Sequence, residues 1–123
     1  MKTSRTVLLV DQDKNVIESV RRVTESMGIR FLHAENGQDG FDIARSVVPD
    51  LVIIRRNAPV LDALSLSVLL KQSENTGKII VIVICTGASP GERECFQDAG
   101  CSGCLEEPFT DKDLQKKMEG WLP

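Results

Sequence analysis

Short runs of apolar residues recur along this chain, and segments with helical spacing separate them. A run without polar alternation is typical of a strand that is covered on both faces of a sheet. The segment at 29–34 is more mixed, which favours an edge position, whereas 79–84 is almost entirely isoleucine and valine, which favours the middle of the sheet. The pattern predicts strands at 7–10, 29–34, 51–54, 79–84 and 101–105.

Apolar residues three or four positions apart predict a helix after each strand. Gly28 and Pro49 are expected to end the first two helices, and Thr110 with Asp113 resembles a capping box at the start of the last. Five alternating units imply an α/β protein with a parallel sheet and helices on both faces. The predicted helices lie at 15–27, 37–48, 63–72, 91–99 and 110–121.

Composition narrows the class of protein. The 123 residues, 41% of them hydrophobic, suit a single domain at 1–123 whose core needs no disulfide or metal. The net charge is −3, from 15 basic and 18 acidic residues, and the absence of a basic stripe argues against direct nucleic-acid binding. The apolar run that begins at Thr6 is too short for a signal peptide or a membrane span. We therefore expect a soluble cytoplasmic protein whose four cysteines are thiols.

Arg55 follows the third predicted strand directly. Ligands and chemistry collect at the carboxyl ends of the strands in open α/β sheets, so a reactive residue is expected at this position. A guanidinium has five N–H donors and no acceptor, which makes arginine a poor nucleophile.

Ordered motifs over nearly the whole chain resemble those of response-regulator receiver domains, the CheY-like superfamily. This resemblance implies a flavodoxin-like (βα)5 three-layer sandwich with a parallel sheet of strand order 2-1-3-4-5, which spacing alone does not give. The matching segments are VLLVDQD at 7–13, AENG at 34–37, PDLV at 49–52, AP at 58–59, TG at 86–87, AG at 99–100 and PF at 108–109.

The resemblance also implies a chemistry, namely transfer of a phosphoryl group from a kinase histidine to an aspartate that ends the third strand. An acidic pair after the first strand holds Mg²⁺ in the family, and positioning and charge neutralisation supply most of the catalysis. Here Arg55 occupies the acceptor position. Gln12 replaces the second acid of the pair, which leaves Asp11 with Asp13 beside it. We therefore expect the family's Mg²⁺ site to be lost, with no other cofactor or metal.

Three further family positions follow the fourth and fifth strands. Glu107, before Pro108, replaces the lysine that contacts the phosphoryl group. Thr86 matches the family's hydroxyl residue, although it can equally serve only its local backbone. Cys104 stands where the family usually places an aromatic switch residue. The segment at 86–91 contains two glycines and a proline, so its conformation need not follow the family's switch.

Arg55 and Glu107 carry the family's charges with the signs exchanged, so a charge pair can persist across the pocket. We hypothesise that Arg55 also approaches Asp11 or Asp13 and replaces the metal's positive charge, which closes the pocket. Alternatively, Arg55 and Glu107 both point into solvent. Asp13 has a second interpretation as the N-cap of the first helix.

These observations favour a pseudo-receiver, which is a non-enzymatic module that acts in two-component phosphorelay signalling through protein–protein interaction. By analogy with the family, the predicted interaction surface comprises 92–97 and 111–117. The expected partners are a histidine kinase, an output domain or another receiver, including a homodimer through the fourth helix, fifth strand and fifth helix.

Two other functions remain open from the sequence. A still-switchable receiver would use Asp11 or Asp13 as a displaced phosphate acceptor, or would bind a small ligand in the altered pocket. A thiol redox or metal module would use the CxxC spacing of Cys101 and Cys104, although ordinary half-buried thiols are the simpler interpretation. His33, the single histidine, is expected to be structural or exposed.

Overall fold

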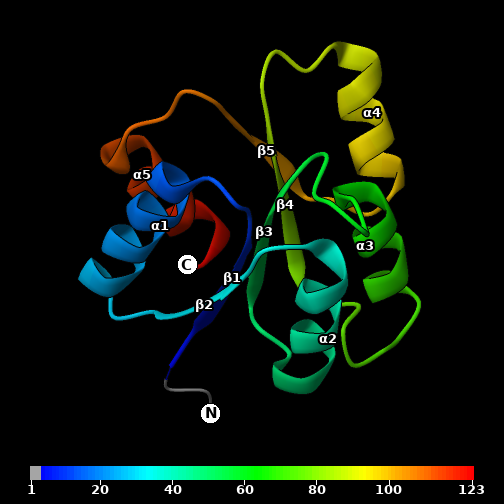
Figure 1. Ribbon diagram of the computed structural model, residues 1–123, viewed down its shortest axis with the longest axis horizontal. Coiled ribbons are helices and arrows are strands. Elements are labelled where there is room, and N and C mark those ends of the chain that lie inside the picture. Colours follow the sequence, from blue (N-terminus) through cyan, green and yellow to red (C-terminus); the bar gives the residue numbers. More distant parts are fainter. Residues whose placement is uncertain (1–3) are drawn as a thin grey trace.

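Strands and helices alternate strictly in the computed structural model, which describes residues 4–123 (Figure 1). Residues 1–3, part of the start judged too short for a signal peptide, lie outside this range. The strands are β1 Thr6–Val10, β2 Arg30–Ala34, β3 Leu51–Arg55, β4 Ile80–Cys85 and β5 Gly103–Glu106. The helices are α1 Lys14–Ser26, α2 Gly37–Val47, α3 Ala63–Lys71, α4 Pro90–Asp98 and α5 Asp111–Trp121.

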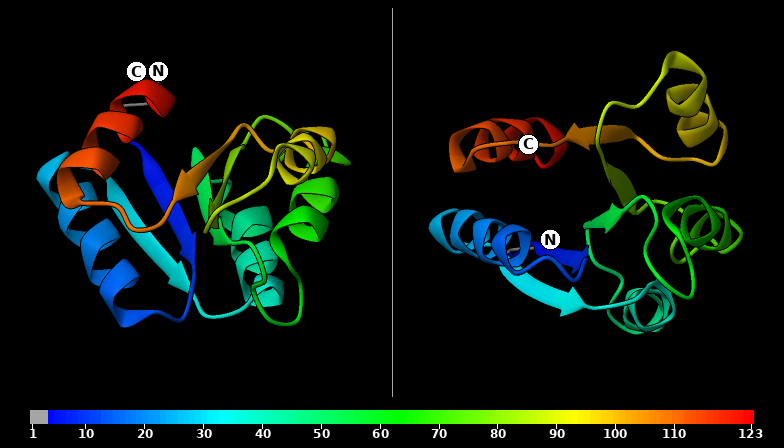
Figure 2. Two further views of the ribbon diagram at one scale, coloured as in Figure 1. Left: turned by 90° about the horizontal axis from the view of Figure 1, so that it is seen from above. Right: turned by 45° about the horizontal axis from the view of Figure 1, so that its top comes forward.

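The strands form one parallel sheet in the order β2-β1-β3-β4-β5. This confirms the predicted fold class, the edge position of β2 and the interior position of β4. Helices α1 and α5 cover one face of the sheet, and α2, α3 and α4 cover the other (Figures 1 and 2). Because all strands point the same way, the residues that follow β1, β3 and β5 meet at one edge of the sheet.

The sheet divides the core into two layers, which explains the absence of polar alternation in its central strands. Side chains of β1, β3 and β4 alternate between the layers, and nearly all of them are fully buried. Burying one such Val, Leu or Ile side chain contributes about 2 kcal/mol to folding. The layer beneath α1 and α5 contains, among others, Val7, Leu9, Ile53, Ile82, Leu114 and Met118. The opposite layer contains, among others, Leu8, Val10, Val52, Leu66, Val83 and Phe96.

Short-range capping sets the helix starts near the site. Asp13 caps α1, with its Oδ1 accepting from the Asn15 amide at 2.9 Å. Thr110 and Asp113 form the predicted capping box at the start of α5. At the other end of α1, Gly28 has φ +70°, a conformation that glycine adopts without strain.

Several predicted boundaries were wrong by one or two residues. The prediction placed Ile29 and Ile79 inside strands, but they precede β2 and β4 as buried loop residues. Cys101 was expected inside the fifth strand, which in fact begins two residues later. In each case an apolar residue is buried beside the sheet without pairing in it, and hydrophobicity alone does not separate the two situations. Within residues 4–123, no helix has the length and apolar character of a membrane span.

A polar contact joins α1 to α5 on the first face. The Asp111 carboxylate accepts hydrogen bonds from Arg22 Nε at 2.9 Å and from the Ser19 hydroxyl. The hydrogen bond from Arg22 and then that from Ser19 hold the pKa of Asp111 below its ordinary value. Since the folded pKa is depressed, this contact stabilises the fold above the unfolded pKa and is lost as pH falls through the folded value.

Replacing Arg22 with glutamine is therefore expected to raise the pKa of Asp111 toward its ordinary value. An NMR titration of the side-chain carboxyl carbon measures the midpoint directly. Arg21→Gln is the matched control, because Arg21 pairs with Glu18 and not with Asp111. Equal Asp111 midpoints in the two variants would contradict the assignment of the shift to Arg22.

Candidate functional site

Three charged side chains meet at the carboxyl edge of the sheet. Asp11 directly follows β1, Arg55 is the last residue of β3, and Glu107 directly follows β5. The backbone aligns them, because Val10 pairs with Ile54 and the Glu107 amide donates to the carbonyl of Cys85 at 2.9 Å. The predicted meeting of these strand ends is therefore present in the fold.

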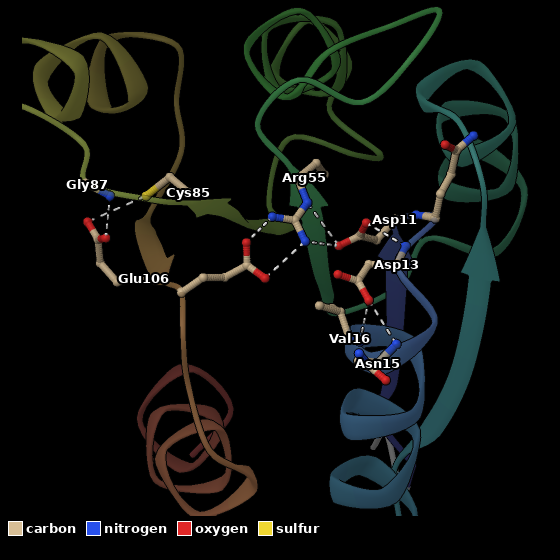
Figure 3. Close-up of polar contacts among 10 residues, drawn as sticks. Asp11, Asp13, Asn15, Val16, Arg55, Cys85, Gly87 and Glu106 are labelled. Carbon is tan, nitrogen blue, oxygen red and sulfur yellow. Dashed lines mark hydrogen bonds and ion pairs between the residues drawn. The ribbon is translucent and has the colours of Figure 1, made fainter.

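The Arg55 guanidinium lies between the two carboxylates and binds both (Figure 3). Its Nε and Nη2 donate to Asp11 Oδ2 at 3.2 and 2.8 Å. Its Nη1 donates to Glu107 Oε1, and Nη2 donates to Glu107 Oε2 at 3.2 Å. The Arg55 side chain is 22% exposed, and those of Asp11 and Glu107 are 4% and 23% exposed. The alternative in which Arg55 and Glu107 point into solvent is therefore wrong.

Asp11 uses every acceptor position of its carboxylate. Oδ1 accepts from the backbone amides of Gln12 at 2.8 Å and Asp13 at 3.1 Å, and Oδ2 accepts both hydrogen bonds from Arg55. An ionised carboxylate offers about four lone-pair positions. Asp11 is thus fully hydrogen-bonded, which is the condition under which a nearly buried charge is tolerated.

The charge of Arg55 is fixed by its partners. Burial by itself lowers the pKa of the guanidinium, but the hydrogen bonds to Glu107 and Asp11 outweigh it and raise the pKa above the ordinary arginine value. The side chain therefore stays protonated at every physiological pH. One cation between two carboxylates leaves the cluster with a formal charge of −1.

The side chains of the other predicted site residues take no part in the bridge of Arg55 with Asp11 and Glu107, although the backbone amides of Gln12 and Asp13 bind Asp11. Asp13 is exposed and uses Oδ1 to cap α1, so its N-cap interpretation is confirmed. The Gln12 side chain is exposed, and Thr86 lies exposed at the start of the β4–α4 loop. Cys104 is half-buried on β5, in the layer beneath α4.

The cysteines are free thiols in the described chain. Cys101 and Cys85 are buried, and Cys85 lies close to Cys104 across the β4–β5 pair. Burial, with a smaller contribution from Cys104, raises the pKa of Cys85 to about 12, and burial also raises that of Cys101. Thiols with raised pKa values are poor nucleophiles. No group of three or more His, Cys, Asp or Glu side chains within 4–123 is arranged to hold a metal ion.

Sequence reasoning missed two contacts at this edge. The His33 Nε2 lies 2.7 Å from the carbonyl oxygen of Asp11, so β2 supports the residue that binds Arg55. Glu106 accepts a hydrogen bond from the Gly87 amide at 3.0 Å (Figure 3). It also pairs with Arg93. The only signal for Glu106 was its place beside Glu107 at the end of a predicted strand.

The sequence of the chain matches a known protein family. The family model "Response regulator receiver domain" matches residues 7–119. The chain is 32% identical over 117 residues to the response regulator MprA of Mycolicibacterium vanbaalenii, covering 94% of this chain and 49% of that protein. It is 24% identical over 118 residues to the polar-differentiation response regulator DivK of Brucella anthropi, covering 96% of each. The chain thus spans about half the length of MprA.

Solved structures agree in fold. The chemotaxis response regulator CheY4 of Vibrio cholerae superposes with a TM-score of 0.91 at 22% identity, covering 98% of this chain and all of that one. The receiver domain of the sensor histidine kinase PA1611 of Pseudomonas aeruginosa, solved with magnesium in its active-site cleft, gives a TM-score of 0.84 at 24% identity. It covers 97% of this chain and 98% of its own.

Proposed function

This chain belongs to the response regulator receiver domain family, and we propose that it is a pseudo-receiver whose phosphorylation pocket is closed by Arg55. Receiver domains act in two-component signal transduction, and they interact with histidine kinases and output domains. In this proposal the domain, residues 1–123, signals through protein–protein contact without aspartyl phosphorylation. The observation that carries it is the hydrogen-bonded bridge from Arg55 to both Asp11 and Glu107.

No group inside the cluster is suited to accept a phosphoryl group. Arg55 stands at the acceptor position, and a guanidinium has no lone pair with which to attack phosphorus. The Asp11 carboxylate, the nearest nucleophile, already accepts four hydrogen bonds. Glu107 presents a negative charge where the resemblance implies a lysine, so it repels an incoming phosphoryl group.

The residues of this edge do not fit Mg²⁺, which receiver domains normally bind at the acceptor site. Magnesium is bound through one or two carboxylates and retained waters. The lone pairs of Asp11 are occupied, Gln12 is a neutral exposed amide, and the Arg55 guanidinium takes the place of a cation beside Asp11. The ion pair therefore supplies internally the positive charge that a metal supplies elsewhere in the family.

The proposed contact surface is formed by α4, β5 and α5. A hollow of about 550 Å³ lies there, lined by apolar, basic and acidic side chains. A partner protein or a second copy of this chain would dock at this face, which we support by family analogy and by this shape. The hollow is lined by Arg93, Cys104, Leu105, Glu106, Pro108, Phe109, Asp113, Lys116 and Lys117.

The proposal is tested by intact-mass spectrometry after incubation with Mg²⁺ and acetyl phosphate. We expect no phosphoryl adduct on the wild-type protein, while a receiver with an intact acceptor aspartate, treated in parallel, becomes modified. The double variant Arg55→Asp, Glu107→Lys reports whether the family chemistry can be restored in this fold.

A stoichiometric, base-labile adduct on the wild-type protein would overturn the proposal. Asp13 is the candidate displaced acceptor, because its side chain is exposed and the α1 cap uses only Oδ1 among its contacts with Asn15 and Val16. Loss of that adduct in Asp13→Asn would then assign a still-switchable receiver.

A further inference from the structure

A second charged residue, Glu106, contacts the loop between β4 and α4 and takes no part in the Arg55 cluster. Glu106 ends β5 and pairs in register with Cys85, which ends β4. From this position its Oε2 accepts from the Gly87 amide at 3.0 Å, and the Ala88 amide lies close enough to the carboxylate to contribute to lowering its pKa. The Cys85 thiol lies 3.7 Å from Oε1 (Figure 3). One side chain of β5 thus binds the Gly87 amide of the loop and lies near the amide that follows it.

The backbone of the loop is shaped for this contact. Gly87 has φ +62°, a left-handed conformation that side chains other than glycine adopt with strain. Such a residue within a turn lets neighbouring N–H groups converge on one anion, and here the anion is a carboxylate of the same chain. The hydrogen bond from Gly87 lowers the pKa of the Glu106 carboxyl, so the group is ionised at neutral pH.

Helix α4 is tied to the same carboxylate. Arg93, in the first half of α4, forms an ion pair with Glu106. The neighbouring Glu92 pairs with Arg56 at 2.6 Å, and Arg56 directly follows the residue that closes the acceptor pocket. Two ion pairs therefore link α4 to the sheet, one to Arg56 after the end of β3 and one to Glu106 at the end of β5. The same two strands carry Arg55 and precede Glu107.

We propose that Glu106 is a positioning residue that holds the β4–α4 loop and α4 in one arrangement. Its carboxylate would thereby fix the conformation of the surface formed by α4, β5 and α5. This inference rests on the proposed function, since it explains how that face is set without phosphate. The carboxylate serves as a permanent intramolecular anion for the loop amides. The face is then constant and available to a partner at all times.

Hydrogen exchange followed by NMR tests this role in the intact protein. Glu106→Gln keeps the shape of the side chain and removes its charge, and we expect the Gly87 and Ala88 amides to exchange about tenfold faster, because hydrogen bonds to charged groups are the stronger ones. Exchange in the first turn of α4 should also rise. Arg93→Gln leaves the amide contacts in place and is expected to affect α4 more than Gly87.

Glu94→Gln is the matched control, since Glu94 is an exposed acid of α4 and the substitution makes the same change in net charge. Exchange rates of Gly87 and Ala88 in Glu106→Gln within twofold of this control would overturn the inference. Unchanged exchange in β1 and β3 excludes general destabilisation as the cause. The two experiments can be judged separately. If acetyl phosphate modifies the wild-type protein and exchange is faster in Glu106→Gln, only the pseudo-receiver proposal is refuted. If the wild-type protein stays unmodified and exchange in Glu106→Gln does not change, only the role of Glu106 is refuted.

Discussion

Replacing Arg55 with methionine is expected to lower the free energy of unfolding by about 3 kcal/mol, because it leaves an uncompensated charge in a nearly buried position. Asp11 is 4% exposed and loses both hydrogen bonds to its Oδ2. Glu107 loses its partner at the same time and faces Asp11 without an intervening cation. Urea denaturation at neutral pH measures the difference.

The control for this variant is Arg56→Met, one residue further along the chain. Arg56 also forms an ion pair, with Glu92, but its side chain is 53% exposed. Exposed pairs contribute about 0.2–1 kcal/mol, so the control should change stability little. A loss in Arg55→Met no larger than in Arg56→Met would mean that the bridge does not compensate Asp11.

A double-mutant cycle isolates the pair itself. Asp11→Asn in the Arg55→Met background removes the orphaned charge and should recover part of the loss, which makes the two substitutions non-additive. Additive losses would indicate that Arg55 stabilises the fold through its other contacts, such as the ion pair with Glu107, and not through Asp11. The measurement is the same urea denaturation, applied to the four proteins of the cycle.

The second large effect is expected at Gly37, where substitution by alanine should destabilise the protein by about 3 kcal/mol through overpacking. A Cβ at this position would lie 1.6 Å from the backbone oxygen of Leu61, and this neighbour is main chain that cannot rotate away. The Gly37 amide also donates to the Pro59 carbonyl at 3.0 Å, so α2 packs directly on the loop that follows β3. Thermal and urea unfolding both report the change.

Gly120→Ala provides a control of opposite sign. Gly120 lies in α5, and nothing lies within 4 Å of an added Cβ. Alanine is favoured over glycine in a helix by about 1 kcal/mol, so this variant should be slightly more stable than the wild type. If both alanine variants unfolded alike, close approach would not be the reason for glycine at position 37.

The parts of the structure that depend on neighbours in the sequence were predictable. The N-cap of α1 is Asp13, and the capping box of α5 is formed by Thr110 with Asp113. Each of these residues lies within three positions of the helix start that it caps, so its role could be inferred from local spacing. The contact of Arg55 with Asp11 could be inferred once the resemblance supplied the strand order, because β1 and β3 are neighbours in the sheet. Glu107 follows β5, which is separated from β3 by β4, so its contact with Arg55 depends on the reach of two long side chains across the same edge. What each charge does in signalling remains a prediction.

The parts that depend on register between strands were not predictable. Glu106 binds the Gly87 amide because Cys85 and Glu106 are paired residues of β4 and β5. The CxxC spacing pairs Cys101 with Cys104 along the chain. In the fold, Cys104 of β5 also lies close to Cys85 of the neighbouring strand β4. Such contacts arise across the sheet, and a single sequence does not reveal the offset between strands.

The opposite charges at positions 55 and 107 depend on each other, so a change of sign at one position has consequences at the other. Arg55→Asp alone would place a third carboxylate beside Asp11 and Glu107, and Glu107→Lys alone would set two cations against each other. Each single substitution replaces an attraction with a repulsion in a partly buried cluster, so we expect each single variant to be less stable than the wild-type protein. Arg55, Asp11 and Glu107 therefore form one unit, in which the charge chosen at either strand end is constrained by the charge at the other.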